Sequence, residues 1–137
     1  MLVRNCSGGI VFRGDKVLLL QNDKHEWIFP KGVIRTDELP EEVAIRRVQT
    51  EAGVAARIIS PAGRTNYEFY SISRQRPVAN KIIWYLMTTE QTDVKPNEAL
   101  DFADGGFFTV EEALSKVTYS QDKSLLLLSY QKYKELV

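Results

Sequence analysis

The chain has 137 residues, 44% hydrophobic and 26% charged, a size and composition that suit one folded domain spanning residues 1–137. Eighteen basic residues balance eighteen acidic ones, so no overall electrostatic field attracts DNA or an anionic membrane. Any site for a phosphate group must therefore be local.

The cysteine content and the first residues bear on the cellular compartment. Cys6 is the only cysteine, so it can form no internal disulfide, and we expect it to be a small buried hydrophobic side chain. The first residues lack the basic region and long apolar run of a signal peptide, and no apolar run approaches a membrane span in length. These features predict a soluble, cytoplasmic protein.

The first part of the chain is predicted to form strands. Two β-rich runs, Ser7–Phe12 and Lys16–Gln21, flank Arg13-Gly14-Asp15, which is typical of a hairpin. A third, short run at Trp27–Phe29 is ended by Pro30.

A helix is predicted from Pro40, because proline suits the first helical turn and the two glutamates that follow favour the positive end of the helix. Gly53 supplies its stop. Three apolar side chains recur on one side and should face the core, namely Val43, Ala44 and Val48.

The rest of the chain alternates between strand and helix signals. Strands are predicted at Ala55–Ser60, Arg64–Tyr70 and Lys81–Thr88, with a loop at Ser71–Asn80 that carries Arg74 and Arg76. After a short extended piece at Phe107-Phe108, two helices are predicted. The first opens with a capping box at Thr109–Glu112, and the second spans Ser120–Leu136 with an apolar stripe through Leu125, Leu128 and Leu136. This order of elements predicts one mixed α/β domain.

The segment Gly32–Val54 resembles the Nudix box. That motif has a glycine, a glutamate after five residues and, after seven more, the run Arg-Glu-aliphatic-x-Glu-Glu-x-Gly-aliphatic. Seven of its nine defined positions match at the right spacing: Gly32, Glu38, Arg46, Val48, Glu51, Gly53 and Val54. Two positions depart, because Arg47 and Thr50 stand where the family has glutamate.

The resemblance covers nearly the whole chain and implies the α+β Nudix fold, a mixed β-sheet sandwiched between helices. It also implies a hydrolase of a nucleoside diphosphate-linked or dinucleoside polyphosphate substrate. Phe29-Pro30-Lys31-Gly32 and Lys81-x-x-x-Tyr85 resemble the branch that hydrolyses diadenosine tetraphosphate. The resemblance also implies that Glu38 and Arg46 form a structural ion pair between the loop and the helix.

The box chemistry needs carboxylates on one helix face. Residues 47, 50 and 51 are spaced i, i+3 and i+4, so their side chains lie together, and magnesium prefers carboxylate oxygens. The resemblance assigns the metal site to Glu51, the Gly32 carbonyl and an outlying acid, either Asp101 or its neighbour Glu98. Because this helix offers only one of three glutamates, we expect Mg2+ to bind weakly or not at all.

Arg47 is the most important difference from the motif, because it replaces a metal-binding glutamate. Arg47 and Glu51 are therefore the candidate catalytic residues. The long side chain of Arg47 can swing aside, pair with Glu51 four residues later, or take the place of the cation and hold a phosphate directly. In every case the site has lost a carboxylate.

Substrate contacts are expected from Lys31, Arg47 and one of two tyrosines, Tyr67 or Tyr85, which could stack on a nucleobase. Two functions stay open on this basis. One is a Nudix hydrolase with weak or lost activity. The other is a non-catalytic module that binds a nucleotide or another phosphate ligand. Both predict a small-molecule partner, and neither distinguishes a monomer from a homodimer.

Overall fold

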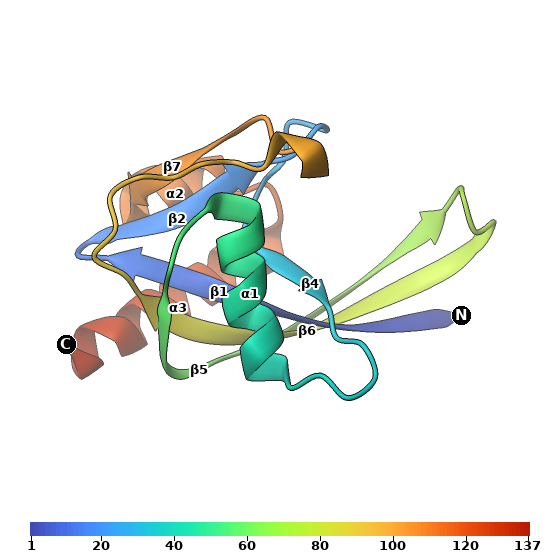
Figure 1. Cartoon of the computed structure of the whole chain (residues 1–137), viewed down its shortest axis with the longest axis horizontal. Coiled ribbons are helices and arrows are strands. Elements are labelled where there is room, and N and C mark those ends of the chain that lie inside the picture. The colour runs from blue at the N-terminus through green and yellow to red at the C-terminus, as the bar shows by residue number, and fades with distance from the viewer.

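A mixed seven-stranded sheet organises the computed structural model, which describes residues 1–137 (Figure 1). Its elements in chain order are β1 (Leu2–Arg13), β2 (Lys16–Gln21), β3 (Trp27–Ile28), β4 (Lys31–Val33), α1 (Pro40–Ala52), β5 (Arg57–Ser71), β6 (Arg76–Thr88), the short 3-10 helix η1 (Glu98–Leu100), β7 (Asp104–Thr109), α2 (Val110–Lys116) and α3 (Ser120–Leu136). The strand order is β3-β2-β1-β6-β5, while β4 pairs with β1 and β7 with β2. Only the β1–β6 pairing is parallel.

The first predicted hairpin is confirmed. Phe12 pairs with Val17 and Arg13 with Lys16, around a turn in which Gly14 has a φ of 60°. Such a left-handed conformation favours glycine because it has no Cβ. Strand β1 begins at Leu2 rather than at the predicted Ser7, since its first residues pair with β6.

The predicted breaks in the second half of the sheet are wrong. Ala55–Ser60 and Arg64–Tyr70 are joined in one strand, β5, whose register shifts near Pro61 allow it to pass a residue that has no N–H to donate. The predicted loop Ser71–Asn80 is mostly strand, because β6 begins at Arg76. Together with the start of β1, this β5–β6 hairpin forms an arm that projects from the body (Figure 1).

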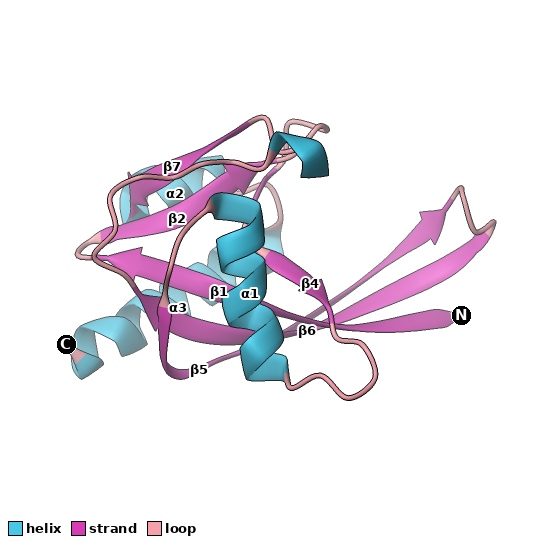
Figure 2. Ribbon diagram, viewed as in Figure 1, coloured by secondary structure: helices cyan, strands magenta, loops and turns pink.

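Helices cover both faces of the sheet, as expected for the sandwich (Figure 2). On one face α1 packs through Ala44 and Val48 onto a cluster that includes Val11 of β1. On the other face α2 and α3 cover a larger cluster around Phe12 and Trp84. Alternation along β1 sends successive side chains to opposite clusters, which is why two separate cores form.

The predicted stripe on α3 is wrong in part. Leu125 is buried as expected, but Leu128 and Leu136 are 64% and 52% exposed. The buried face runs instead through Leu125, Leu126, Ser129 and Tyr133. Both sets fit helical spacing, and packing decided between them, because Tyr133 stacks on Phe12 with ring centroids 4.5 Å apart.

The predictions for the first helix and for Cys6 are confirmed. Val43, Ala44 and Val48 are fully buried, and Cys6 is 2% exposed. None of the helices combines the length and the apolar character that crossing a membrane would require.

Candidate functional site

The box residues lie on α1, whose ends are set by local chemistry. Pro40 occupies its first turn, and Gly53 ends it in the left-handed conformation, with φ 66° and an N–H donated to the Gln49 carbonyl at 2.9 Å. The last turns of this helix face β4. A Cβ built on Gly32 would lie 2.5 Å from Cδ of Arg47, so the Arg47 side chain lies directly over this glycine.

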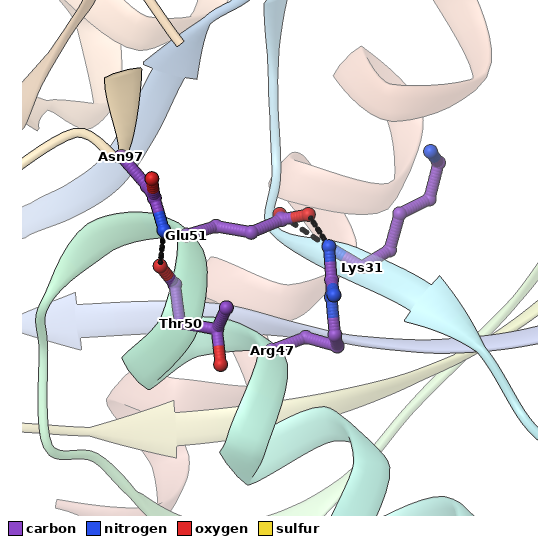
Figure 3. Close-up of polar contacts among 5 residues, drawn as sticks. All are labelled: Lys31, Arg47, Thr50, Glu51 and Asn97. Carbon is purple, nitrogen blue, oxygen red and sulfur yellow. Dashed lines mark hydrogen bonds and ion pairs between the residues drawn. The ribbon is translucent and has the colours of Figure 1, made fainter. Parts of the chain in front are cut away.

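Arg47 pairs with Glu51, one of the three placements considered above. The two side chains form an ion pair of 2.5 Å between Nη2 and Oε2 (Figure 3). The other oxygen of Glu51 accepts the backbone N–H of Lys31 at 3.2 Å, while the side chain of Lys31 points away from the pair (Figure 3). Both oxygens of Glu51, the only one of the three metal-site glutamates that remains on α1, are therefore engaged by the protein itself.

The Glu51 side chain is only 6% exposed, and burial raises the pKa of its carboxyl group, because a charge loses its hydration in the interior. The charges of Arg47 and Lys31 act in the opposite direction but do not cancel the effect of burial. Glu51 thus depends on Arg47 for its charge compensation.

Arg47 has unused hydrogen-bonding capacity. Its Nε is buried and has no partner. A buried N–H without an acceptor costs about 1–3 kcal/mol, and such groups are commonly satisfied by ordered water or a bound ion. The Arg47 side chain is 28% exposed, so solvent or a ligand can also reach the guanidinium.

A pocket of about 330 Å³ opens beside this pair, and we name it the basic pocket. Its lining contains five cationic side chains and one carboxylate. The lining residues are Arg4, Cys6, Lys31, Gly32, Val33, Arg35, Arg46, Arg47 and Glu51. Arg46 is paired with Glu38 at 2.7 Å, as the box resemblance implies. The cations come from β1, β4, the loop after β4 and α1, so a chain without net charge has a concentrated positive site.

The residues at the box do not fit a divalent cation. No three histidine, cysteine, aspartate or glutamate side chains converge anywhere in the structure, and Glu51 is already bonded to a guanidinium. Glu98 and Asp101 are exposed on or beside η1. That segment is tied to the end of α1 by Asn97, whose Nδ2 donates to the Thr50 carbonyl at 2.9 Å. The assignment of Asp101 or Glu98 as an outlying ligand stays a prediction.

A second pocket, of about 150 Å³, lies on the α3 face of the sheet, and we name it the aromatic pocket. Its lining residues are Asn22, Glu26, Ile28, Phe29, Lys31, Thr65, Tyr67, Ile82, Trp84, Tyr119, Ser120, Gln121 and Asp122. Tyr67 stacks on Tyr119, with ring centroids 6.0 Å apart and planes 14° from parallel. Because Lys31 lines both pockets, the two sites meet at this side chain.

The two candidate tyrosines lie on opposite faces of the sheet. Tyr67 lines the aromatic pocket, whereas Tyr85 packs against the cluster beneath α1 and donates its hydroxyl to Glu41 at 2.7 Å. Burial and the Glu41 carboxylate together raise the pKa of Tyr85 to about 12. Strand alternation thus places only one of the two beside either pocket.

The comparisons with known proteins agree with this geometry. A model of the NUDIX domain family matches residues 4–128. The chain belongs to the Nudix family. Over 99 residues it is 29% identical to a Mycobacterium tuberculosis protein that carries the name MutT4. That match covers 72% of this chain and 39% of MutT4, so the chain spans about two fifths of the relative's length.

Solved structures share the fold of this Nudix chain. The Ap4A hydrolase of C. elegans, in a binary complex, has a TM-score of 0.72 and 20% identity, covering 98% of this chain and 99% of that one. The dihydroneopterin triphosphate pyrophosphohydrolase of E. coli has a TM-score of 0.73 and 14% identity, covering 92% and 95%. A NUDIX family hydrolase of Clostridium perfringens has a TM-score of 0.73 and 18% identity, covering 98% of both chains.

Several side chains of this Nudix site are not signalled by the sequence. Arg4 reaches the basic pocket only because β1 pairs with β4, and Tyr119 reaches Glu26 across 93 positions of sequence. Asp122 joins the aromatic pocket from the first turn of α3. Arg35 could have been found from the sequence, because it lies within the box segment Gly32–Val54.

Asp122 gives a first prediction, on stability. Burial raises the pKa of the Asp122 carboxyl group to about 6, although the charge of Lys31 opposes the shift. Above pH 6 the carboxylate is charged in both the folded and the unfolded state, and its burial then lowers the stability of the fold. This destabilisation disappears below about pH 4, where the group is protonated in both states. Asp122→Asn should raise the free energy of unfolding by roughly 2–3 kcal/mol at pH 7.5 and leave it unchanged at pH 3.5. Urea denaturation at both pH values measures this, and equal effects at the two would contradict it.

Proposed function

We propose that this Nudix chain binds the phosphate groups of a nucleotide or dinucleoside polyphosphate in the basic pocket without a divalent cation. We also propose that it hydrolyses them slowly or not at all. The observation that carries the proposal is the Arg47–Glu51 ion pair, which puts a guanidinium on the helix face where the box chemistry needs carboxylates. The remaining support comes from the charge around that pair and from the neighbouring pocket.

A phosphate group needs positive charge and N–H donors, and the basic pocket supplies both. Guanidinium groups present several N–H donors in a plane, which suits phosphate oxygens. Arg47 has a free Nε, and Arg4 and Lys31 form no salt bridge in the structure. Arg4 and Lys31 can therefore take an anion without first breaking an internal ion pair.

The same charges oppose a metal ion. A guanidinium about 5 Å from a divalent cation would repel it by roughly 7 kcal/mol at an effective dielectric constant of 20, before screening by salt. A magnesium ion at the box would also have to compete with Arg47 for Glu51. Arginine, in place of a metal ion, would thus supply the positive charge that binds the phosphate.

The aromatic pocket supports a nucleotide over a bare phosphate. It adjoins the basic pocket at Lys31, and Tyr67 and Tyr119 supply aromatic surface on its wall. A ligand with its base in the aromatic pocket and its phosphates in the basic pocket would pass Lys31 between them. Tyr67 is therefore preferred to Tyr85 as the base contact.

Residual hydrolysis is the second candidate function, supported by the family membership and by Glu51. The loss of a metal-ligating or acid–base group typically lowers the rate by about 10²–10⁴-fold. In a coupled site two such losses do not simply multiply, since a site already broken has less to lose. Turnover is thus expected to be very low.

Calorimetric titration with pyrophosphate and with ADP tests the proposal, first in EDTA and then in millimolar magnesium. We expect both ligands to bind in EDTA with an affinity that magnesium does not improve, and magnesium alone to bind in the millimolar range or not detectably. Binding that requires magnesium, or micromolar affinity for magnesium alone, would contradict metal-free binding. Phosphate release at several per second that Glu51→Gln abolishes would instead favour the hydrolase.

A further inference from the structure

The projecting arm has an open strand edge. Strand β5 is the last strand of the sheet, so one of its edges has no neighbouring strand. In the arm, β6 lies between β5 and the start of β1 (Figure 1). The middle strand is buried there, at residues 78–80, whereas residues 68–70 of β5 are exposed. The outer edge of β5 is thus accessible to another strand.

The hydrogen bonds of Asn66 show which backbone groups of β5 point outward. Its N–H donates to the side chain of Gln121 at 3.2 Å, and its carbonyl accepts from the same side chain at 2.8 Å, so both point away from β6. Backbone groups alternate between the two edges of a strand, so those of Glu68 and Tyr70 point outward as well. The pairing of Tyr70 with Pro77 agrees with this, because proline has no N–H to donate. The N–H and carbonyl groups of both residues therefore lie open in a row beyond Gln121.

This open stretch lacks the features that usually keep strand edges apart. Natural edges are commonly protected by lysine, proline, a bulge or a covering segment. The register shifts of β5 and the Gln121 contact all lie before Tyr67, and residues 67–71 contain no lysine and no proline. Two aromatic side chains of this stretch, Phe69 and Tyr70, are 38% and 62% exposed. An accessible edge with exposed aromatic side chains indicates a surface for strand pairing.

We propose that β5 pairs with β5 of a second copy of this chain, in an antiparallel register with Phe69 on the twofold axis. Glu68 then lies opposite Tyr70 of the second copy, and the two residues exchange both backbone hydrogen bonds. The twofold axis repeats this pair and joins the two arms in one continuous sheet. The open edge is thereby closed by an identical edge.

Charge and existing hydrogen bonds select this register over its neighbours. A shift that centres the pairing on Glu68 would place two carboxylates opposite each other, and it would need edge groups that are already bonded to α3. A shift that centres it on Tyr70 would need the carbonyl of Ile72, which accepts the N–H of Gln75 at 3.3 Å in the turn. With Phe69 on the axis, each carboxylate faces a neutral tyrosine and no like charges meet.

Aromatic side chains supply the apolar contact of this interface. Phe69 lies beside Tyr67, with ring centroids 6.1 Å apart, and strand alternation puts both on the α3 face of the arm. On the axis, the two Phe69 side chains form a non-hydrogen-bonded cross-strand pair, the arrangement in which side chains approach most closely. Because Tyr67 also lines the aromatic pocket, the pocket of each copy lies beside the interface.

Charge placed at residue 70 tests the register. Because Tyr70 lies opposite Glu68 in the dimer, Tyr70→Glu brings like charges together and Tyr70→Lys brings opposite charges together. Sedimentation equilibrium over a range of protein concentrations should show a monomer–dimer equilibrium for the wild type. Tyr70→Glu should raise the dissociation constant by at least about tenfold, whereas Tyr70→Lys should keep the dimer and make it weaker at high salt. Unchanged circular dichroism shows that both variants are folded.

A disulfide trap locates the interface independently. Phe69→Cys should form a covalent dimer on mild oxidation, since the Cα atoms of a non-hydrogen-bonded pair lie about 4.5 Å apart, within the range that a disulfide spans. Val3→Cys is the matched control, because Val3 is 46% exposed but lies on the opposite edge of the arm. It should give no covalent dimer.

Three results would overturn the inference. The first is a wild-type protein that stays monomeric at millimolar concentration, which would leave the edge to a strand of a different protein. The second is a dimer that responds alike to Tyr70→Glu and Tyr70→Lys, because the sign of the charge matters only opposite Glu68. The third is cross-linking through Val3→Cys but not through Phe69→Cys, which would show that the β1 edge is used instead. None of these results bears on phosphate binding in the basic pocket.

Discussion

Replacing Arg47 with alanine is expected to weaken pyrophosphate binding in EDTA by about 1.5–3 kcal/mol, or roughly 10–150-fold, the usual contribution of a hydrogen bond to a charged group. The physical reason is that Arg47 is the one cation of the basic pocket that has a buried, unpaired N–H. Calorimetry with pyrophosphate measures the loss directly. Magnesium should not restore the affinity, because the site still lacks two carboxylates.

The same substitution should also destabilise the fold. It leaves Glu51 buried without a counter-ion, and removal of one partner of a buried pair typically costs about 3–5 kcal/mol. The double variant Arg47→Ala/Glu51→Gln removes both charges and should recover much of this stability while still binding pyrophosphate poorly. It thus separates the ligand effect from unfolding.

Arg74→Ala is the control for charge alone. Arg74 lies in the turn at the tip of the β5–β6 hairpin, outside the basic pocket, and its loss changes the net charge by the same amount. It should leave the affinity for pyrophosphate intact. If the folded Arg47→Ala/Glu51→Gln protein bound pyrophosphate as tightly as the wild type, Arg47 would have no role in phosphate binding.

The double substitution Arg47→Glu with Thr50→Glu is expected to restore magnesium binding and to raise the hydrolysis of diadenosine tetraphosphate by at least about 10²-fold. With Glu51 it places three carboxylates at i, i+3 and i+4 on the face of α1 that meets β4. Thr50 is exposed, and glutamate is shorter than the Arg47 side chain that now lies over Gly32, so both changes can be accommodated.

The melting temperature of this double variant provides a second test. Three neighbouring carboxylates repel one another, so the double variant should unfold at a lower temperature than the wild type in EDTA. A ligand that binds only the folded state stabilises it, so magnesium should raise the melting temperature of the variant and not that of the wild type. Each single substitution leaves the site one carboxylate short and should show neither response. A double variant that folds normally yet binds no magnesium would refute the idea that a latent metal site remains.

The sequence by itself determined the features that depend on interactions between residues close together in the chain. The bounds of α1 follow from Pro40 and Gly53. The capping box at the start of α2 consists of Thr109 and Glu112, and the side chain of each accepts the backbone N–H of the other. The Arg47–Glu51 pair was one of three placements that the sequence left open, because residues four apart on a helix are neighbours, and the structure selects it. Family resemblance extended this local information to the Nudix fold and to the Glu38–Arg46 pair.

The tertiary structure decided what depends on partners distant in the chain. Strand β5 runs through Pro61 because β6 pairs with it on both sides of that residue, and α3 turns Tyr133 inward because Phe12 lies opposite. The same holds for function. Arg4 joins the basic pocket through the β1–β4 register, and Asp122 joins the aromatic pocket where α3 meets the sheet. Backbone preference and helical spacing act over a few residues, whereas a site assembled from four elements depends on strand register and packing, which no short segment encodes.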